Sequence, residues 1–375
     1  MGGRERAGSE KDSQSDELLG FHNDMSFGSP RACWALECQS NHPIAKRLRG
    51  ICWNELPRSA EPSWIRRKMA TSTPPPAQSK VLVFARRSAS TLFLWGLVVA
   101  IFISGWSWAV LALIGVLTLV ATVEYFQMLA AAGIRCFPRF GIGLCLAYSL
   151  AIYGFFLRGE AVVPSGVDSF ALLLAITGPF ALQLRHSVRG LETLQGIAAN
   201  VLGFVYIAFL FNFAAQVTFI APGANVVPGL VGKSGAVLLL WLLAVTKFTD
   251  MGAYITGSMI GKRKMIPHIS PGKTWEGFAG ALFFALLAGC GLYALVPQHL
   301  GFLGGWNHVI FLSLLLAVLA VIGDLAESII KRSLNAKDSG RMLPGIGGSL
   351  DLIDSLCFTA PTLYFYLKWV LLPAA

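Results

Sequence analysis

The sequence has little charge. Asp, Glu, Lys and Arg make up 13% of its 375 residues, whereas soluble domains carry about 25%. It also lacks paired cysteines: seven are scattered without a Cys-x-x-Cys motif, and those in or beside apolar segments are Cys136, Cys145, Cys290 and Cys357. Neither a disulfide framework nor a zinc site is therefore expected. The low charge excludes a water-soluble fold and predicts a chain embedded in the lipid bilayer.

The first 80 residues lack the apolar runs of the remainder. They are polar, contain a proline run at positions 74–76, and have no apolar segment of the kind that secretory signal peptides require. We predict that residues 1–80 are a disordered N-terminal extension. One hypothesis is that translation starts at Met69 and that residues 1–68 are not part of the native chain. Mass spectrometry of the native N-terminus would test it.

Long apolar runs dominate from Arg86 onward. Nine have the length that a helix needs to cross a bilayer, at about residues 89–105, 107–124, 138–157, 170–185, 195–217, 235–260, 275–296, 306–330 and 352–371. The predicted fold is therefore an all-α polytopic membrane protein with about nine transmembrane helices. We divide it into N-terminal transmembrane helices, residues 85–234, and a C-terminal domain, residues 235–375.

The basic residues indicate the orientation in the membrane. The net charge of +10 is concentrated in alternate loops between apolar runs, at Arg86, Arg87, Arg135, Arg139, Arg185, Arg189, Lys262, Arg263, Lys264, Lys273, Lys331, Arg332, Lys337 and Arg341. The intervening loops carry little basic charge, with Arg158 as the main exception. The positive-inside rule therefore places the N-terminus in the cytoplasm. This pattern fits a membrane surface, and no nucleic-acid partner is expected.

Carboxylates are unevenly distributed among the apolar runs. A charge at the bilayer centre costs about 2.5–3.5 kcal/mol on insertion scales, and in the first five runs Glu124 is the exception. The last four runs carry six carboxylates near their cytoplasmic ends: Asp250, Glu276, Asp324, Glu327, Asp351 and Asp354. The pairs 324/327 and 351/354 each have the three-residue spacing that places two side chains on one helix face. This clustering predicts a divalent cation, and oxygen ligands favour Mg²⁺.

A basic loop at residues 261–277 lies between two of these runs. Ser270, Lys273 and Thr274 precede a predicted helix start, where backbone N–H groups and a lysine can bind phosphate. A Walker P-loop is excluded because position 267 is Pro where that motif has glycine, and because no strand is predicted before it. The alternative is a basic loop that attaches to anionic lipid.

A second polar stretch, residues 323–355, combines all the components of a phosphoryl-transfer or nucleotidyl-transfer site. It contains two carboxylate pairs, four basic residues and a group of glycines at positions 345, 347 and 348. Glycines allow the backbone to approach a phosphate closely. Cations and metal-bound carboxylates neutralise the charge of the phosphates. The simpler alternative is a set of solvated helix ends.

This stretch resembles the signature of the phosphatidate cytidylyltransferase (CDP-diacylglycerol synthase) family. The residues that match in register are Ser328, Lys331, Arg332, Lys337, Asp338, Pro344, Gly345, Gly347, Gly348, Asp351 and Asp354. Residues 268–277, and Asp250 with its neighbours, are similar to two further family segments. Two positions depart from the pattern: Ile346 stands where the family usually has His, and Leu352 where it usually has Arg.

The resemblance implies an enzyme that converts CTP and phosphatidic acid to CDP-diacylglycerol and pyrophosphate in a bacterial inner membrane, with its active site facing the cytoplasm. It implies Mg²⁺ on Asp324, Asp351 and Asp354, as one or two divalent ions, with a monovalent ion left open. The implied role of Lys331, Arg332 and Lys337 is to neutralise CTP, and that of Ser270, Lys273 and Thr274 is to contact a phosphate. Further implied site residues are Asp250 as a metal-binding or ordering carboxylate, and Asp338, Gly347 and Gly348 in substrate binding.

Three alternatives remain open from the sequence. The substrate is another lipid phosphate, such as a polyprenyl phosphate; or the enzyme is a CTP-dependent lipid kinase; or the protein is an ion-coupled transporter. The carboxylates cluster near one face instead of crossing the bilayer, which disfavours a transporter. A CDP-alcohol phosphotransferase is disfavoured because its Asp-Gly-x-x-Ala-Arg motif is absent. A homodimer is also left open.

Overall fold

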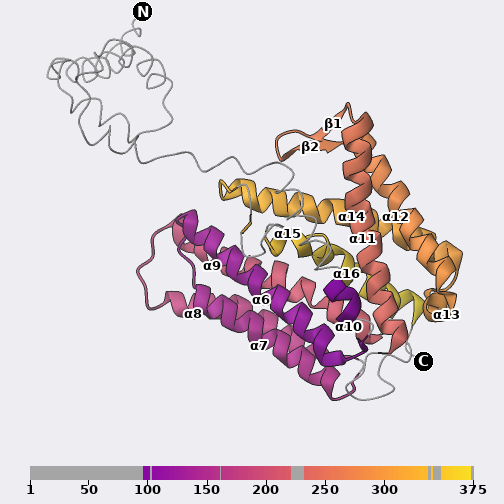
Figure 1. Cartoon of the computed structure of the whole chain (residues 1–375). Helices are drawn as coiled ribbons and strands as arrows, with labels where there is room; N and C mark the ends of the chain where they lie inside the picture. The colour runs from indigo at the N-terminus through magenta and orange to yellow at the C-terminus, as the bar shows by residue number, and fades with distance from the viewer. Residues whose placement is uncertain are drawn as a thin grey trace, which may run out of the picture. The chain divides into compact units, whose positions relative to one another are not determined.

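The computed structural model describes residues 96–101, 104–160, 162–220, 232–336, 339–340 and 348–372. The predicted extension at residues 1–80, including Met69, and most of the first predicted span, 89–105, lie outside these residues. The description that follows therefore concerns residues from 96 onward (Figure 1).

Within the described residues, seven helices are long and apolar enough to cross a membrane. They are α6 (Ser107–Ala131), α7 (Pro138–Leu157), α8 (Ser165–Gln183), the continuous segment of α9 (Leu191–Gly203), the π-helical η2 (Phe204–Phe209) and α10 (Phe213–Ile220), then α11 (Lys233–Ile260), α12 (Trp275–Leu295) and α14 (Trp306–Ser333). A helical membrane protein is thus confirmed. The count of nine is not: the ninth predicted span is α16 (Leu356–Tyr366) with η4 (Leu367–Leu371), which together are shorter than any of the seven.

Four short elements connect these helices. α13 (Pro297–Leu300) and the 3₁₀ turn η3 (Gly301–Leu303) join α12 to α14, and α15 (Leu350–Ile353) precedes α16. The fourth is an antiparallel hairpin of β1 (Lys264–Ile266) and β2 (Ser270–Thr274), which lies at one end of α11 and α12 (Figure 1). The sequence did not predict this hairpin. It places residue 274 directly before α12, where the Thr274 Oγ1 accepts a hydrogen bond from the Gly277 N–H at 3.1 Å and caps the helix.

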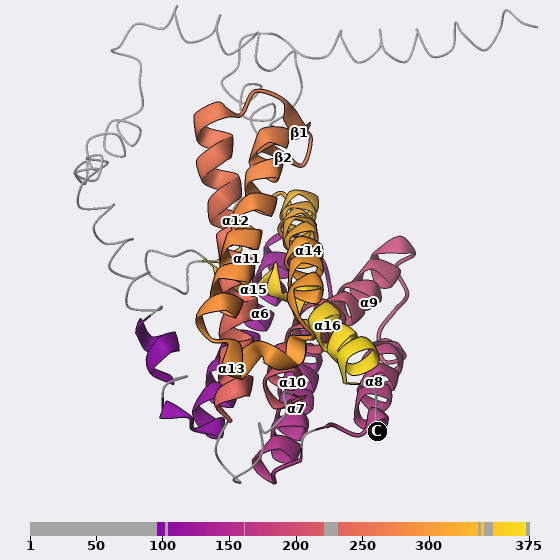
Figure 2. The same ribbon diagram turned by 90° about the vertical axis from the view of Figure 1, so that its right-hand side faces the viewer.

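Helices α11 and α12 lie side by side in both views (Figures 1 and 2). Glycines allow their backbones to approach closely. A Cβ added to Gly252 would lie 2.7 Å from the Gly280 carbonyl oxygen, and one added to Gly277 would lie 2.9 Å from the Ala253 carbonyl oxygen. Small residues serve this purpose in membranes, where helix association depends on packing more than on the hydrophobic effect. The packed α11–α12 pair holds the β1–β2 hairpin next to the candidate site.

Several polar connections lie at the same end of the helical domain. The Phe137 and His186 rings, from the α6–α7 and α8–α9 connections, have centroids 5.7 Å apart. A Cβ added to Gly196, near the start of α9, would overlap the Arg135 carbonyl oxygen. Glu124, near the end of α6, contacts Ser349 before α15. Within the described residues, the basic connections between α6 and α7 and between α8 and α9 therefore share an end with the C-terminal carboxylates.

Candidate active site

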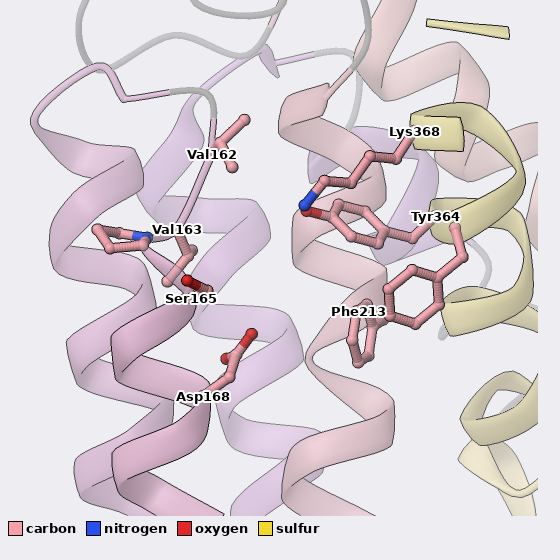
Figure 3. Close-up of a pocket in the computed structure, with 9 residues that line it drawn as sticks. Val162, Val163, Ser165, Asp168, Phe213, Tyr364 and Lys368 are labelled. Carbon is pink, nitrogen blue, oxygen red and sulfur yellow. The ribbon is translucent and has the colours of Figure 1, made fainter. Parts of the chain in front are cut away.

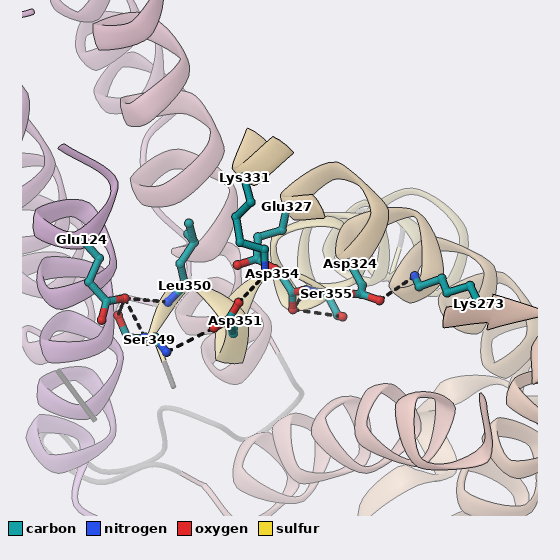
Figure 4. A network of polar contacts seen from close by, with 11 residues as sticks. Glu124, Lys273, Asp324, Glu327, Lys331, Ser349, Leu350, Asp351, Asp354 and Ser355 are labelled. Carbon is teal, nitrogen blue, oxygen red and sulfur yellow. Dashed lines mark hydrogen bonds and ion pairs between the residues drawn. The ribbon is translucent and has the colours of Figure 1, made fainter. Parts of the chain in front are cut away.

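Three carboxylates meet where α14 passes the α15–α16 connection (Figure 4). Asp324 and Glu327 come from one face of α14, and Asp354 lies between α15 and α16. One oxygen from each carboxylate lies within 4.8 Å of the others. Glu327 and Asp354 are buried, with exposed fractions of 1% and 4%. Hard oxygen ligands at this separation can surround a small divalent cation.

Gly323 explains how these helices come so close. A Cβ at this position would lie 2.7 Å from the Asp354 carbonyl oxygen and 2.9 Å from the Ser355 Cα. No side chain therefore fits between α14 and the backbone of residues 354–355. Because Asp324 is the next residue, the contact at Gly323 places it beside Asp354.

Two lysines border the cluster. Lys273 from β2 forms an ion pair with Asp324, with Nζ and Oδ2 2.5 Å apart. Lys331, two helical turns after Asp324, pairs with the Glu327 Oε2 at 2.8 Å and with the Asp351 Oδ1 at 2.7 Å. Two of the three predicted phosphate-binding lysines, Lys273 and Lys331, are thus beside the carboxylates. Lysines at such a position can supply the positive charge that a phosphorylated substrate needs.

Asp351 itself is not a member of the three-carboxylate cluster. Its Oδ1 contacts Lys331, and its Oδ2 accepts a hydrogen bond from the Gly348 N–H at 3.1 Å. Burial acts to raise its pKa, but the contacts with Glu327 and Lys331 outweigh burial and hold the pKa at about 2. Its predicted role as a metal ligand remains a prediction, whereas its pairing with Lys331 is direct.

Asp354 has a different electrostatic environment. Burial raises its pKa to about 7, and the nearby charge of Asp324 acts in the same direction. Its Oδ1 accepts hydrogen bonds from the Ser355 N–H at 2.5 Å and the Ser355 Oγ at 3.2 Å. These bonds fix the orientation of the carboxyl group.

Asp250 lies on α11, close to this network but outside the three-carboxylate cluster. Its Oδ2 is 3.5 Å from the Nζ of Lys247. Lys247 also donates a hydrogen bond to the Leu352 carbonyl oxygen at 3.2 Å. Lys247 thus connects α11 to α15, and the role of Asp250 as a metal-binding or ordering carboxylate stays a prediction.

The other predicted residues are distributed as follows. Ser270 is half-buried in β2, Thr274 caps α12, and Arg332 is exposed at the end of α14. Gly348 is described and donates to Asp351. Lys337, Asp338 and Gly347, with the divergent position Ile346, lie outside the described residues.

Three functional candidates were not predicted as site residues. Glu327 was recognised as sharing a face with Asp324, but its membership in the cluster depends on how α14 is rotated toward Asp354. Lys247 carried a signal, since it is a cation inside an apolar run. Glu124 carried the same kind of signal, because it is the one carboxylate in the first five apolar runs. Nothing in the sequence indicated its partner.

A separate cavity of about 380 Å³ lies between the start of α8 and the end of α16 (Figure 3). Asp168 and Lys368 are the charged residues in its lining, and Asp168 accepts a hydrogen bond from the Tyr148 hydroxyl at 2.9 Å. None of the described site residues lines this cavity. It therefore does not compete with the carboxylate cluster as the candidate active site.

The fold and site together define a polytopic helical membrane protein with a carboxylate and lysine cluster suited to phosphoryl or nucleotidyl transfer. Residues 85–370 match the cytidylyltransferase family. The chain therefore belongs to the cytidylyltransferase family and is a nucleotidyltransferase.

Individual relatives agree with this assignment. The phosphatidate cytidylyltransferase of Bacillus subtilis (strain 168) is 31% identical over 250 residues, which cover 66% of this chain and 85% of that protein. The phosphatidate cytidylyltransferase of Brucella suis biovar 1 (strain 1330) is 44% identical over 132 residues, 35% of this chain and 47% of that protein. The uncharacterized protein YnbB of Escherichia coli (strain K12) is 31% identical over 280 residues, 73% of this chain and 85% of that protein.

Proposed function

We propose that the protein transfers the cytidylyl group of CTP to phosphatidic acid, giving CDP-diacylglycerol and pyrophosphate. The observation that carries the proposal is the cluster of Asp324, Glu327 and Asp354, bordered by Lys273 and Lys331, in a chain of the cytidylyltransferase family. Carboxylates and lysines at helix ends suit a substrate that has a polyphosphate head and a lipid tail.

The donor set fits a divalent cation. Asp324, Glu327 and Asp354 offer three carboxylate oxygens within 4.8 Å of one another, and Mg²⁺ is usually held by one or two carboxylates together with substrate phosphates. When bound there, Mg²⁺ would neutralise developing charge on the phosphates. Asp351, the third ligand expected from the sequence, would serve a second ion; alternatively, its contact with Lys331 is its main role.

The chemistry needs no protein nucleophile. An oxygen of the lipid phosphate attacks the α-phosphorus of CTP, and the bond to the β-phosphate oxygen breaks to release pyrophosphate. The contribution of the protein is positioning and charge neutralisation. We assign the neutralising role to Lys273 and Lys331, with Arg332 at the end of α14 in reach of the outer phosphates, and Ser270 as a phosphate contact from β2.

The site would face the cytoplasm of a bacterial inner membrane, where CTP is available. Supporting this orientation, the basic connections and the carboxylates share one end of the helical domain, as the positive-inside rule requires for a cytoplasmic face. The phosphate of a membrane lipid would then meet CTP at that surface.

The test is a reconstituted assay. Purified full-length protein is mixed with CTP labelled at its α-phosphate, Mg²⁺ and liposomes that contain phosphatidic acid, a polyprenyl phosphate or a lipid alcohol. We expect labelled CDP-lipid and an equal amount of pyrophosphate with phosphatidic acid only. Labelled product from the polyprenyl phosphate alone would assign the second substrate class, and no product from any lipid would contradict nucleotidyl transfer.

A matched pair of variants separates the site from the fold. Asp354→Asn should remove turnover, because it deletes a carboxylate of the cluster. Asp168→Asn, which changes a carboxylate in the separate cavity, should leave turnover near the wild-type rate. Equal activity of the two variants would contradict the assignment of the site.

A further inference from the structure

Glu124 is an unusual residue for its position. It lies in α6, within the N-terminal transmembrane part, and is fully buried. A carboxylate inside a membrane helix is costly and is retained where it has a defined partner. The proposed mechanism gives no metal-binding or phosphate-binding role to Glu124, so its burial needs a separate explanation.

Its partners lie at the start of α15, where Ser349 directly precedes the helix and Leu350 is its first residue (Figure 4). The Glu124 Oε2 accepts hydrogen bonds from the Ser349 N–H at 2.7 Å, the Ser349 Oγ at 3.0 Å and the Leu350 N–H at 3.2 Å. The first N–H groups of a helix have no partner within that helix. Glu124 therefore satisfies the donors at the start of α15 from more than 220 residues away in the chain.

Two glycines allow the backbone to approach this carboxyl group closely. A Cβ added to Gly348 would lie 3.0 Å from the Glu124 Oε2, and one added to Gly340 would overlap the Glu124 side chain. The other oxygen, Oε1, is buried and has no hydrogen-bond partner within the described residues. The carboxyl group is thus enclosed by backbone on the α15 side.

Residue 350 transmits this contact to the cluster. The Leu350 N–H is held by Glu124, and the Leu350 carbonyl oxygen accepts a hydrogen bond from the Asp354 N–H at 3.0 Å. Asp351, the next residue, holds Lys331 at 2.7 Å. One short turn of helix therefore connects Glu124 to Asp354 and to Lys331.

We propose that Glu124 is a positioning residue that fixes the start of α15, and so places Asp354 in the carboxylate cluster and Asp351 against Lys331. The proposal rests on the proposed function, because it assigns Glu124 to the same site. It makes the metal affinity of the C-terminal domain depend on a side chain from the N-terminal transmembrane part.

The test compares Glu124→Leu with Glu124→Gln in the full-length protein. Leu keeps most of the volume but accepts no hydrogen bond, whereas the Gln amide oxygen can accept the same three bonds. Hydrogen bonds that orient metal ligands change metal affinity by about 10- to 100-fold, so Glu124→Leu should weaken Mn²⁺ binding, measured by electron paramagnetic resonance, within that range. Glu124→Gln should recover most of the affinity, and the Mg²⁺ concentration for half-maximal turnover should follow the same order.

Controls keep this inference separate from the proposed function. Glu192→Leu changes an exposed glutamate at the start of α9 and should leave Mn²⁺ affinity unchanged. If Glu124→Leu does not fold, Ser349→Ala removes one of the three bonds and should weaken Mn²⁺ binding to a smaller extent. The inference would be overturned if Glu124→Leu bound Mn²⁺ with wild-type affinity, or if Ser349→Ala did so when it is measured instead. It would also be overturned if Glu124→Leu and Glu124→Gln had equal defects, or if the wild-type protein did not bind Mn²⁺. Failure to form CDP-lipid would overturn the proposed function alone, because Mn²⁺ binding is measured without substrate.

Discussion

Gly323→Ala tests the geometry of the site with the smallest possible change. The added methyl group would lie 2.7 Å from the Asp354 carbonyl oxygen, which falls about 0.7 Å short of the 3.4 Å at which ordinary van der Waals contact begins. The obstacle is backbone, which cannot rotate away as a flexible side chain can. Either α14 or the 354–355 segment must therefore move.

The expected effect on turnover is large. Displacements of about 1 Å at a reacting site can reduce rates by about 100-fold. The alanine methyl group would move Asp324 and Glu327 away from Asp354 by about 0.7 Å. We expect kcat for CDP-lipid formation to fall by about 10- to 100-fold, and Mn²⁺ affinity to fall with it. Steady-state assays with labelled CTP and Mn²⁺ titrations measure the two quantities.

Gly291→Ala is the matched control. Gly291 also lies in a transmembrane helix, α12, but a Cβ there would meet nothing within 4 Å among the described residues. Replacing a helical glycine with alanine should raise helix stability by about 0.5–1 kcal/mol without affecting turnover. Wild-type kcat and Mn²⁺ affinity in Gly323→Ala would refute the proposed contact between α14 and Asp354.

Two other substitutions test the charges and the packing around the site. Lys331→Met leaves the buried Glu327 without its cation. We therefore expect a loss of about 3–5 kcal/mol in unfolding free energy, measured by denaturant unfolding in detergent, together with loss of turnover. Unchanged stability would show that the ion pair is unimportant in the folded state. Gly252→Leu introduces atoms within 2.7 Å of the Gly280 carbonyl oxygen and should destabilise the α11–α12 pair by about 1–3 kcal/mol, whereas Gly291→Leu should have no comparable effect on the unfolding transition.

The membrane helices could be predicted from the sequence because their cause is local. An apolar run of sufficient length satisfies its own backbone hydrogen bonds as a helix, and lipid offers no alternative partner. The runs predicted at 107–124 and 306–330 correspond to α6 and α14. Both helices extend beyond these runs, α6 through residues 125–131 and α14 through residues 331–333. The hairpin at 264–274 was missed because it is short, and because β1 carries no alternating pattern.

The composition of the site could be predicted only in part. A three-residue spacing places Asp324 with Glu327, and Asp351 near Asp354, on their respective helices. It does not determine how α14 is rotated toward residues 351–354, and so which of the four carboxylates meet. The contact of Gly323 with residues 354–355 decides that, and it depends on packing between segments that are distant in sequence.

The charge balance around the cluster connects these observations. Within the described residues, Asp250, Asp324, Glu327, Asp351 and Asp354 form one network with Lys247, Lys273 and Lys331. If all are ionised, five negative charges face three positive charges, and the difference of two equals the charge of one divalent cation. Burial raises the pKa of Asp354 to about 7, and the nearby negative charges of Asp324 and Asp250 act in the same direction. A cation that enters with the phosphates of CTP would therefore stabilise the ionised form of the network, which links metal binding to substrate binding at this site.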